Sequence, residues 1–236
     1  MTFSISGRCA RSGMVGVAVA SRFLAVGALC PHVGGGAGAV ATQALVNPLL
    51  GIDGVRLLAE GLSAGETLDR LLSGKTGAHL RQVCVVDHSG GAAAHTGDCC
   101  VTWAGHRTGE GYAIAGNMLV GPAVLEAMEQ AWLASESTEL PERLLLALEA
   151  GQAAGGDKRG KQAAALLVAG REEYPYLDLR VDDHPDPIPE LRRLWTLSEQ
   201  TFAPYRELLP TRANAEGVTD PERIAAARAR ANRAAP

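Results

Sequence analysis

The chain opens with MTFSISG (residues 1–7), where hydroxyl-bearing and apolar side chains alternate from residue 2 to residue 6. An alternation with a period of two predicts a β-strand that has one polar face and one apolar face. Because this strand would start almost at the chain terminus, its first residue, Thr2, is the first candidate for a reactive group.

Thr2 carries the two groups that one type of covalent catalysis needs. Removal of Met1, which a small second residue permits, would leave Thr2 with a free α-amine beside its own hydroxyl. The amine can serve as the general base for the hydroxyl in amide hydrolysis. Its reference pKa of about 8 leaves part of it neutral near pH 7. The alternative is that Thr2 is only the second residue of a strand at the protein surface.

Composition excludes several classes of function. The chain has 236 residues, 47% of them hydrophobic, and a formal net charge of -4, which suits one sizeable domain or two small ones. The mildly acidic balance has no basic stripe, so we expect no nucleic-acid partner. Without an apolar run of about 18 residues, we expect no membrane partner.

The N-terminus and the cysteines both favour a cytoplasmic location. The first residues lack the basic region and apolar segment of a signal peptide. The cysteine number is odd and no C-x-x-C occurs, which fits buried thiols in a reducing compartment better than a disulfide framework. The five cysteines are Cys9, Cys30, Cys84, Cys99 and Cys100.

The remaining segments predict layers of strands and helices. Residues 14–20 are apolar on both sides, which is typical of a strand covered on both faces. Strands and helices then follow in blocks, which indicates an α+β fold rather than strict βαβ alternation. Further strands are expected at 24–30, 39–43, 82–86, 92–96, 112–115, 162–169 and 177–181, and helices at 51–61, 64–72, 118–133, 141–153 and 190–197.

Two patterns that could hold a cofactor or a metal are weak. Residues 36–41 fit the G-x-G-x-x-A dinucleotide fingerprint, but Pro48 would interrupt the long helix that the fingerprint requires. Residues 182–184 (DDH) contain ligand-type side chains, but the adjacent prolines are typical of a capped turn. We therefore expect no cofactor and no metal.

Seven stretches of the chain are distinctive: TFSI (2–5), GVAVASRFLAVG (16–27), ATQ (41–43), WAGH (103–106), GNML (116–119), GGDKRG (155–160) and RVDDHP (180–185). Together they resemble a bacterial family catalogued as domain of unknown function 1028, over nearly all of residues 1–197. The layout is also similar to the N-terminal-nucleophile (Ntn) hydrolases. The resemblance implies their fold, a four-layer αββα sandwich of two stacked, mainly antiparallel sheets between helical layers.

The domain prediction is a single Ntn-hydrolase-like domain over residues 1–210. From residue 211 the composition shifts to Ala, Arg and Glu, with few apolar anchors. Residues 211–236 are therefore interpreted as a tail, either helical or disordered.

The resemblance also implies roles for two charged residues. In proteasome-type members, an aspartate in a glycine-flanked turn helps to orient the threonine, and Asp157 lies in such a turn. Its alternative role is to stabilise that turn by pairing with Lys158 or Arg159. Arg22 lies near where those members place a cation that lowers the pKa of the threonine. The alternative for Arg22 is an ordinary surface salt bridge.

Asn117 is the candidate for stabilising an oxyanion. It follows Gly116 at what we interpret as a junction between a strand and a helix N-terminus, where amide and N–H groups can hold negative charge. Asparagine also caps helices well, which is the alternative. Arg107 and Arg159 are suited to bidentate binding of a carboxylate. The substrate-binding candidates are Arg22, His32, Gln43, Asn47, His106, Arg107 and Arg159.

These features predict an amidohydrolase that cleaves a C–N bond, amide or ureido, in a small molecule that can carry a carboxylate. Thr2 would attack, its amine would take the proton, and Asn117 would stabilise the intermediate; Asp157 completes the predicted catalytic set. The alternative is a non-catalytic binding or scaffold protein with the same fold. Glycine-rich packing in a layered sandwich also predicts a homo-oligomer.

Overall fold

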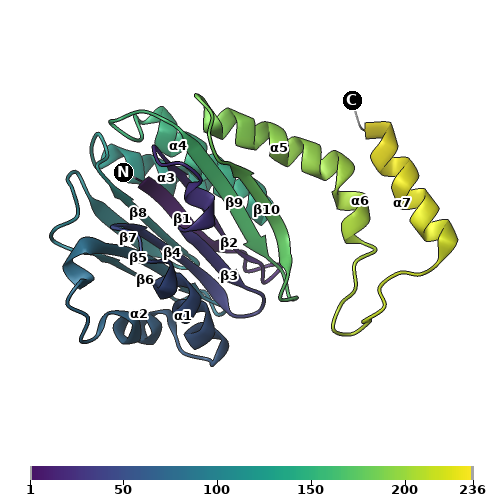
Figure 1. The fold of residues 1–236 in the computed structure, drawn as a ribbon, viewed down its shortest axis with the longest axis horizontal. Helices are drawn as coiled ribbons and strands as arrows, with labels where there is room; N and C mark the ends of the chain where they lie inside the picture. Colours follow the sequence, from purple (N-terminus) through teal and green to yellow (C-terminus); the bar gives the residue numbers. More distant parts are fainter. Residues whose placement is uncertain (1, 235–236) are drawn as a thin grey trace. The chain divides into compact units, whose positions relative to one another are not determined.

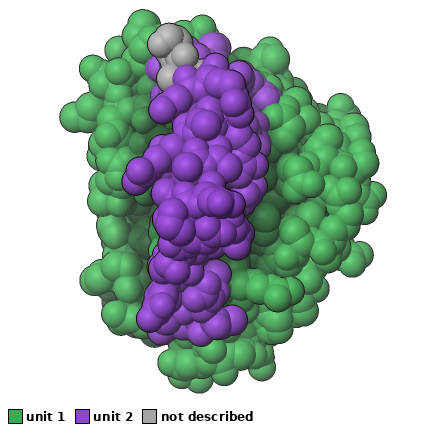
Figure 2. Space-filling model, turned by 90° about the vertical axis from the view of Figure 1, so that its right-hand side faces the viewer, with its two compact units in different colours: residues 1–188 green, residues 189–236 purple. Residues whose placement is uncertain are grey.

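The computed structural model describes residues 2–234 and divides into two compact units, residues 1–188 and 189–236 (Figure 2). Met1, whose removal the predicted mechanism requires, lies outside the described residues, as do the last two residues of the predicted tail. Every strand belongs to the first unit, and so does every candidate site residue.

The larger sheet has six antiparallel strands in the order β10-β9-β2-β1-β8-β7, so the N-terminal strand lies in its middle. The chain forms a hairpin from β1 to β2 and returns much later to place β8 on the other side of β1. The strands are β1 (Thr2–Arg8), β2 (Val15–Ser21), β7 (Gly105–Gly109), β8 (Tyr112–Asn117), β9 (Ala163–Ala169) and β10 (Pro175–Val181).

The smaller sheet has four antiparallel strands in sequence order, β3-β4-β5-β6. Its β5–β6 pair is the predicted hairpin around residues 87–91. The strands are β3 (Pro31–Gly34), β4 (Gly38–Ala44), β5 (Arg81–Asp87) and β6 (Ala92–Thr96).

Helices cover the outer face of each sheet, which completes four layers in the order α, β, β, α (Figure 1). Helices α1 (Pro48–Ala59) and α2 (Ala64–Leu72) pack on the smaller sheet, and α3 (Ala123–Ala134) and α4 (Leu140–Ala153) pack on the larger one. The predicted capping box is present at the start of α2. The αββα sandwich expected from the resemblance to Ntn hydrolases is therefore confirmed.

The alternation in β1 assigns its two faces as the sequence predicts. Phe3 lies on the face toward α4, where a Cβ added at Gly151 would come within 3.3 Å of its ring. The hydroxyl of Ser4 points the other way and donates to Gln43 of the smaller sheet. Thr2, two residues from Ser4, shares its face and therefore lies between the sheets.

Between the sheets the packing is mostly apolar and built from small residues. Valine and alanine side chains of β2, β8 and β9 meet alanines, a cysteine and a valine from β4 and β5. The small side chains allow the two sheets to approach closely. The side-chain amides of this layer gather at the end where β1 begins, which is described below, while the buried hydroxyl of Ser6 lies farther along β1.

Two sequence predictions of secondary structure are wrong. Residues 24–30 were expected as a strand, but they form a short 3-10 helix, η1 (Val26–Ala28), entered through Ala25 in a left-handed conformation with φ 53. The helix expected from residue 118 begins only at Ala123. A second 3-10 helix, η2 (Ala78–Leu80), precedes β5.

The second unit is helical. It contains α6 (Ala203–Arg206), α7 (Pro221–Ala234) and most of α5 (Pro187–Thr201), which begins at the end of the first unit. Helices α6 and α7 contact each other, and Arg230 of α7 pairs with Glu207 at 2.9 Å. Across residues 2–234, none of the helices combines the length and apolar character needed to cross a bilayer.

Candidate active site

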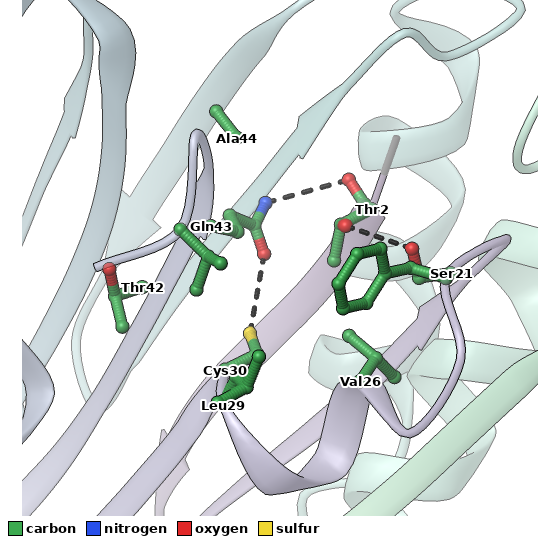
Figure 3. Close-up of a pocket in the computed structure, with 10 residues that line it drawn as sticks. Thr2, Ser21, Val26, Leu29, Cys30, Thr42, Gln43 and Ala44 are labelled. Atoms are coloured by element: carbon green, nitrogen blue, oxygen red, sulfur yellow. Dashed lines mark hydrogen bonds between the residues drawn. The ribbon is translucent and has the colours of Figure 1, made fainter. Parts of the chain in front are cut away.

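The register of the larger sheet brings three polar residues together at one end. Thr2 is paired with Ser21 at the end of β2 and with Asn117 at the end of β8. The hydroxyl oxygens of Thr2 and Ser21 are 3.1 Å apart and buried (Figure 3). The candidate nucleophile is therefore held by a neighbouring hydroxyl rather than exposed on a frayed terminus.

Three side-chain amides connect the two sheets beside Thr2. Gln82 of β5 accepts at Oε1 from Gln43 Nε2 at 2.8 Å and from Asn117 Nδ2 at 3.0 Å. Gln43 also places Nε2 at 3.5 Å from the carbonyl oxygen of Thr2, and its Oε1 accepts from Ser4 at 2.7 Å. This network fixes the amides of Gln43 and Asn117 against the strand that carries Thr2.

A cavity of about 60 Å³ opens directly beside Thr2. The segment around η1 forms one wall of it, and the end of β4 forms another (Figure 3). Thr2 and Ser21 contribute to its lining, so a molecule bound there would contact the candidate nucleophile. The ten residues that line it are Thr2, Ser21, Phe23, Val26, Leu29, Cys30, Thr42, Gln43, Ala44 and Val46.

Cys30 is the second nucleophile-type side chain in this cavity. Complete burial raises the pKa of the Cys30 thiol to about 12. Only the thiolate form of cysteine is strongly nucleophilic, so Cys30 stays protonated and unreactive near neutral pH. Its Sγ lies 3.8 Å from Gln43 Oε1, as expected of a weak thiol donor. Thr2 is thus the better candidate for a covalent step at this site.

Asp157 lies in the predicted turn before β9 and ties that turn to the end of β2. Its Oδ2 accepts from the backbone N–H of Arg22 at 3.0 Å, and its Oδ1 accepts from the backbone N–H of Arg159 at 2.7 Å. Arg159 also pairs with the carboxylate at 3.3 Å. Asp157 therefore makes the pairing with Arg159 that its turn-stabilising alternative describes. Because Arg22 follows Ser21 directly, the same bonds also position the hydroxyl partner of Thr2.

Arg22 and Arg159 lie on the outer side of this arrangement. Both are exposed, and the guanidinium of Arg22 donates to the carbonyl oxygen of Arg159. This contact of Arg22 is a hydrogen bond to a backbone carbonyl. It is not the ordinary surface salt bridge of the alternative interpretation. Both guanidinium groups are exposed next to the end of β2, and that of Arg159 is paired with Asp157.

The expectation that Asn117 lies at a helix N-terminus is wrong. Helix α3 begins at Ala123, so Asn117 is the last residue of a strand and caps no helix. The intervening loop is held elsewhere, because the N–H groups of Met118 and Leu119 donate to carbonyls in residues 101–103. What keeps Asn117 near Thr2 is its strand register, not a helix dipole.

Four other predicted residues serve other contacts. Asn47 caps α1 through Leu49 N–H, and His32 packs so closely under α1 that a Cβ at Gly51 would meet its ring at 2.1 Å. Burial lowers the pKa of His32. None of the four lines the cavity beside Thr2. The other two are Arg107, which pairs with Glu129 at 2.6 Å, and His106, whose Nδ1 is 2.9 Å from the hydroxyl of Thr96.

Sequence reasoning missed Ser21, Cys30 and Gln82. For Ser21 a signal exists: pairing around a turn at residues 11–13 sets each residue of β1 opposite one of β2, and Thr2 falls opposite Ser21. For Cys30 and Gln82 no local pattern suffices, because their place depends on how the second sheet stacks on the first. No group of three or more metal-ligand side chains gathers anywhere in residues 2–234.

A threonine that opens a central strand of an αββα sandwich, beside a cavity, is the layout of the N-terminal-nucleophile hydrolase class. Within that class of fold, the chain belongs to a family of unknown function, DUF1028, whose model matches residues 2–191. It is similar to protein SPO2555 from Silicibacter pomeroyi, of the same family. In that crystal structure the identity is 32%, the TM-score is 0.85, and the match covers 93% of this chain and 96% of the other.

Two weaker structural likenesses were found. Anbu (ancestral beta-subunit) from Yersinia bercovieri shows 13% identity and a TM-score of 0.39 over 89% of this chain and 99% of that one. An Anbu (Gly-1) mutant from Hyphomicrobium sp. strain MC1 shows 12% identity and a TM-score of 0.42, with the same coverage. No curated protein matches the sequence.

Proposed function

We propose that this protein is an N-terminal-nucleophile amidohydrolase in which Thr2 cleaves an amide or ureido C–N bond of a small molecule. The observation that carries the proposal is the buried Thr2 hydroxyl at 3.1 Å from Ser21, at the wall of a cavity. A nucleophile needs a hydrogen-bonded partner and space for the reacting carbonyl, and this strand end offers both.

The reaction would proceed in two steps. Thr2 Oγ1 attacks the carbonyl carbon while the free α-amine of Thr2 accepts the hydroxyl proton. The C–N bond then breaks, the ammonium returns the proton to the leaving nitrogen, and an ester remains on Thr2. Water, deprotonated by the same amine, hydrolyses that ester and restores the hydroxyl. Ser21 acts as a positioning residue that fixes the direction of Thr2 Oγ1.

Asn117 is the proposed oxyanion donor. Its amide nitrogen carries two hydrogens, and the bond to Gln82 engages one of them. The other can donate to an oxygen that develops negative charge next to Thr2, its partner in the sheet. Asp157 acts one step away from the reacting atoms, because its carboxylate holds the end of β2 through Arg22.

Substrate recognition is proposed to combine the cavity with the exposed arginines. A carboxylate, where the substrate has one, would meet Arg22 and Arg159 outside the cavity, where it keeps part of its hydration. Gln43 would contact the substrate from the cavity wall. A homo-oligomer in the cytoplasm, without a nucleic-acid or membrane partner, remains the proposed setting.

The decisive experiment starts with the intact mass of the protein expressed in a bacterial cytoplasm. Loss of one methionine is expected, because the mechanism needs Thr2 to be the first residue. A β-lactone, whose strained ring acylates hydroxyl nucleophiles, should then add once, and peptide mapping should find it on Thr2. Thr2→Ala should not react and Thr2→Ser should. Uniform retention of Met1 would reject this mechanism and favour the non-catalytic binding protein.

A further inference from the structure

We propose that the cavity beside Thr2 binds an uncharged, branched aliphatic side group of about four non-hydrogen atoms, carried on the carbon next to the scissile carbonyl. The inference rests on the proposed function and adds the chemical class of the substrate. It is argued from the position, the size and the lining of the cavity.

Position links the cavity to the acyl side of the substrate. Thr2 and Ser21 line it, and their hydroxyls face each other at 3.1 Å (Figure 3). A carbonyl carbon in reach of Thr2 Oγ1 lies about 3 Å from that oxygen before attack. The group that fills the cavity must therefore be attached within one or two bonds of that carbonyl.

Size limits the group that fits. The cavity volume is about 60 Å³, and one water-sized centre needs roughly 15 Å³. The space thus corresponds to about four non-hydrogen atoms, an isobutyl group rather than an aromatic ring. Val26 and Cys30 are almost fully buried and belong to the core between the sheets, so that wall has little freedom to move.

Charge is excluded by the lining. The ten described residues around the cavity include no charged side chain. Their polar groups also bond to each other: Gln43 is engaged at both ends of its amide, and the Thr42 hydroxyl donates to the carbonyl of Asn47 at 3.2 Å. A carboxylate in the cavity would lose its hydration and gain no charged side chain as a partner. Beside the Thr2 α-amine it would also hold that group in its protonated form, which cannot act as the base, so a charged side group is disfavoured on both counts.

The first test compares two β-lactones of the same shape. One carries isobutyl on the carbon next to the carbonyl, and the other carries carboxymethyl. With each, Thr2 Oγ1 would attack the carbonyl while the α-amine takes the hydroxyl proton. The ring C–O bond would then break, and the released alkoxide would take that proton from the ammonium just formed. We expect the isobutyl probe to acylate Thr2 at least roughly a hundredfold faster. Equal rates, or a faster carboxymethyl probe, would overturn the proposal.

Variants locate the effect in the cavity. The isobutyl lactone should acylate Thr2 faster than the unsubstituted lactone by on the order of a hundredfold, since each buried carbon contributes about fourfold. Leu29→Ala enlarges the cavity, so this rate ratio should fall at least tenfold. Leu57→Ala is the matched control. Leu57 is also half-buried, but it belongs to α1 and packs against the hydrophobic cluster on the outer face of the smaller sheet. The same fall in both variants would contradict the assignment of the pocket.

A binding measurement separates failure of the pocket from failure of the chemistry. The ligands are isovaleramide and malonamate, which carry isobutyl and carboxymethyl directly on the carbonyl carbon. Binding is measured with Thr2→Ala, which has no hydroxyl to attack either amide. Isovaleramide alone should shift the methyl resonances of Val26 and Leu29 and leave Leu57 unchanged. This result, together with no acylation of Thr2 by the lactones in the unsubstituted protein, would reject the catalytic proposal and keep the pocket. No shift with isovaleramide, or a larger one with malonamate, would reject the pocket itself.

Discussion

Gln82 carries the hydrogen bonds that join the two sheets at the Thr2 end, and its replacement tests that arrangement. The side chain is 0% exposed. Its Nε2 lies within 3.0 Å of the Thr96 hydroxyl and of two backbone carbonyls, while its Oε1 accepts from Gln43 and Asn117. One side chain therefore satisfies two buried amides and orients the proposed oxyanion donor.

Gln82→Met keeps the approximate shape but removes every donor and acceptor. The amide nitrogens of Gln43 and Asn117 then lose their shared acceptor inside the sandwich. Each buried polar group left without a partner costs about 1–3 kcal/mol, so two cost about 2–6 kcal/mol. A domain of this kind is stable by about 5–15 kcal/mol, so the variant should still fold but with much less reserve.

Urea unfolding followed by tryptophan fluorescence measures this loss. Gln130→Met is the matched control, because Gln130 is exposed on α3 and its change should stay within about 0.5 kcal/mol. The midpoint for Gln82→Met should fall with little change in the urea dependence. Equal midpoints for Gln82→Met and Gln130→Met would refute the view that Gln82 connects the sheets.

Three further results are expected. Burial alone raises the pKa of Asp87, but four hydrogen bonds outweigh it and the net pKa is lowered. The stability that Asp87 contributes is thus present above its unfolded pKa of about 3.9 and is lost as pH falls through the lower folded value. When the urea midpoint is plotted against pH, Asp87→Asn should therefore show a smaller decrease on the acidic side. Exposed Cys99 should react with iodoacetamide in the native protein at least about a hundredfold faster than Cys30, whose pKa is raised to about 12 by burial; equal rates would show that Cys30 is not enclosed. Asp157→Asn, which weakens the bond to Arg22, should slow acylation of Thr2 about tenfold or more while Lys161→Ala does not, and unchanged acylation would remove Asp157 from the positioning residues.

The alternation of polar and apolar residues made the main strands predictable, and the capping signal did the same for one helix. The polar and apolar faces of residues 2–7, the two-sided apolar strand at 14–20 and the capping box at residue 63 each act over a few neighbouring residues. Such local signals survive tertiary packing when they agree with it. They were sufficient for an α+β fold of layered strands and helices, whereas the four-layer αββα order was expected only from the family resemblance.

The site was less predictable because several of its residues are positioned by contacts distant in sequence. Asn117 looked like a helix cap, yet the chain continues into a loop whose N–H groups bond to residues 101–103. The segment at residues 24–30 looked like a strand, yet it turns through Ala25 and forms a wall of the cavity. In both places tertiary hydrogen bonding or packing overrode the local pattern.

The polarity of the layer between the sheets supports a functional origin for this end of the sandwich. Toward the other end of β2 the same layer holds Val15 and Val17, and its polar side chain there, within the described residues, is the single hydroxyl of Ser6, opposite Val17. Near Thr2 it holds buried Ser4, Gln43 and Gln82 instead, and such a network contributes less stability than apolar packing unless every member is satisfied. Stability alone would favour apolar residues at both ends. The confinement of the amides to the strand end with the threonine is what a site that must orient polar groups requires, and that cost in stability is typical of functional sites.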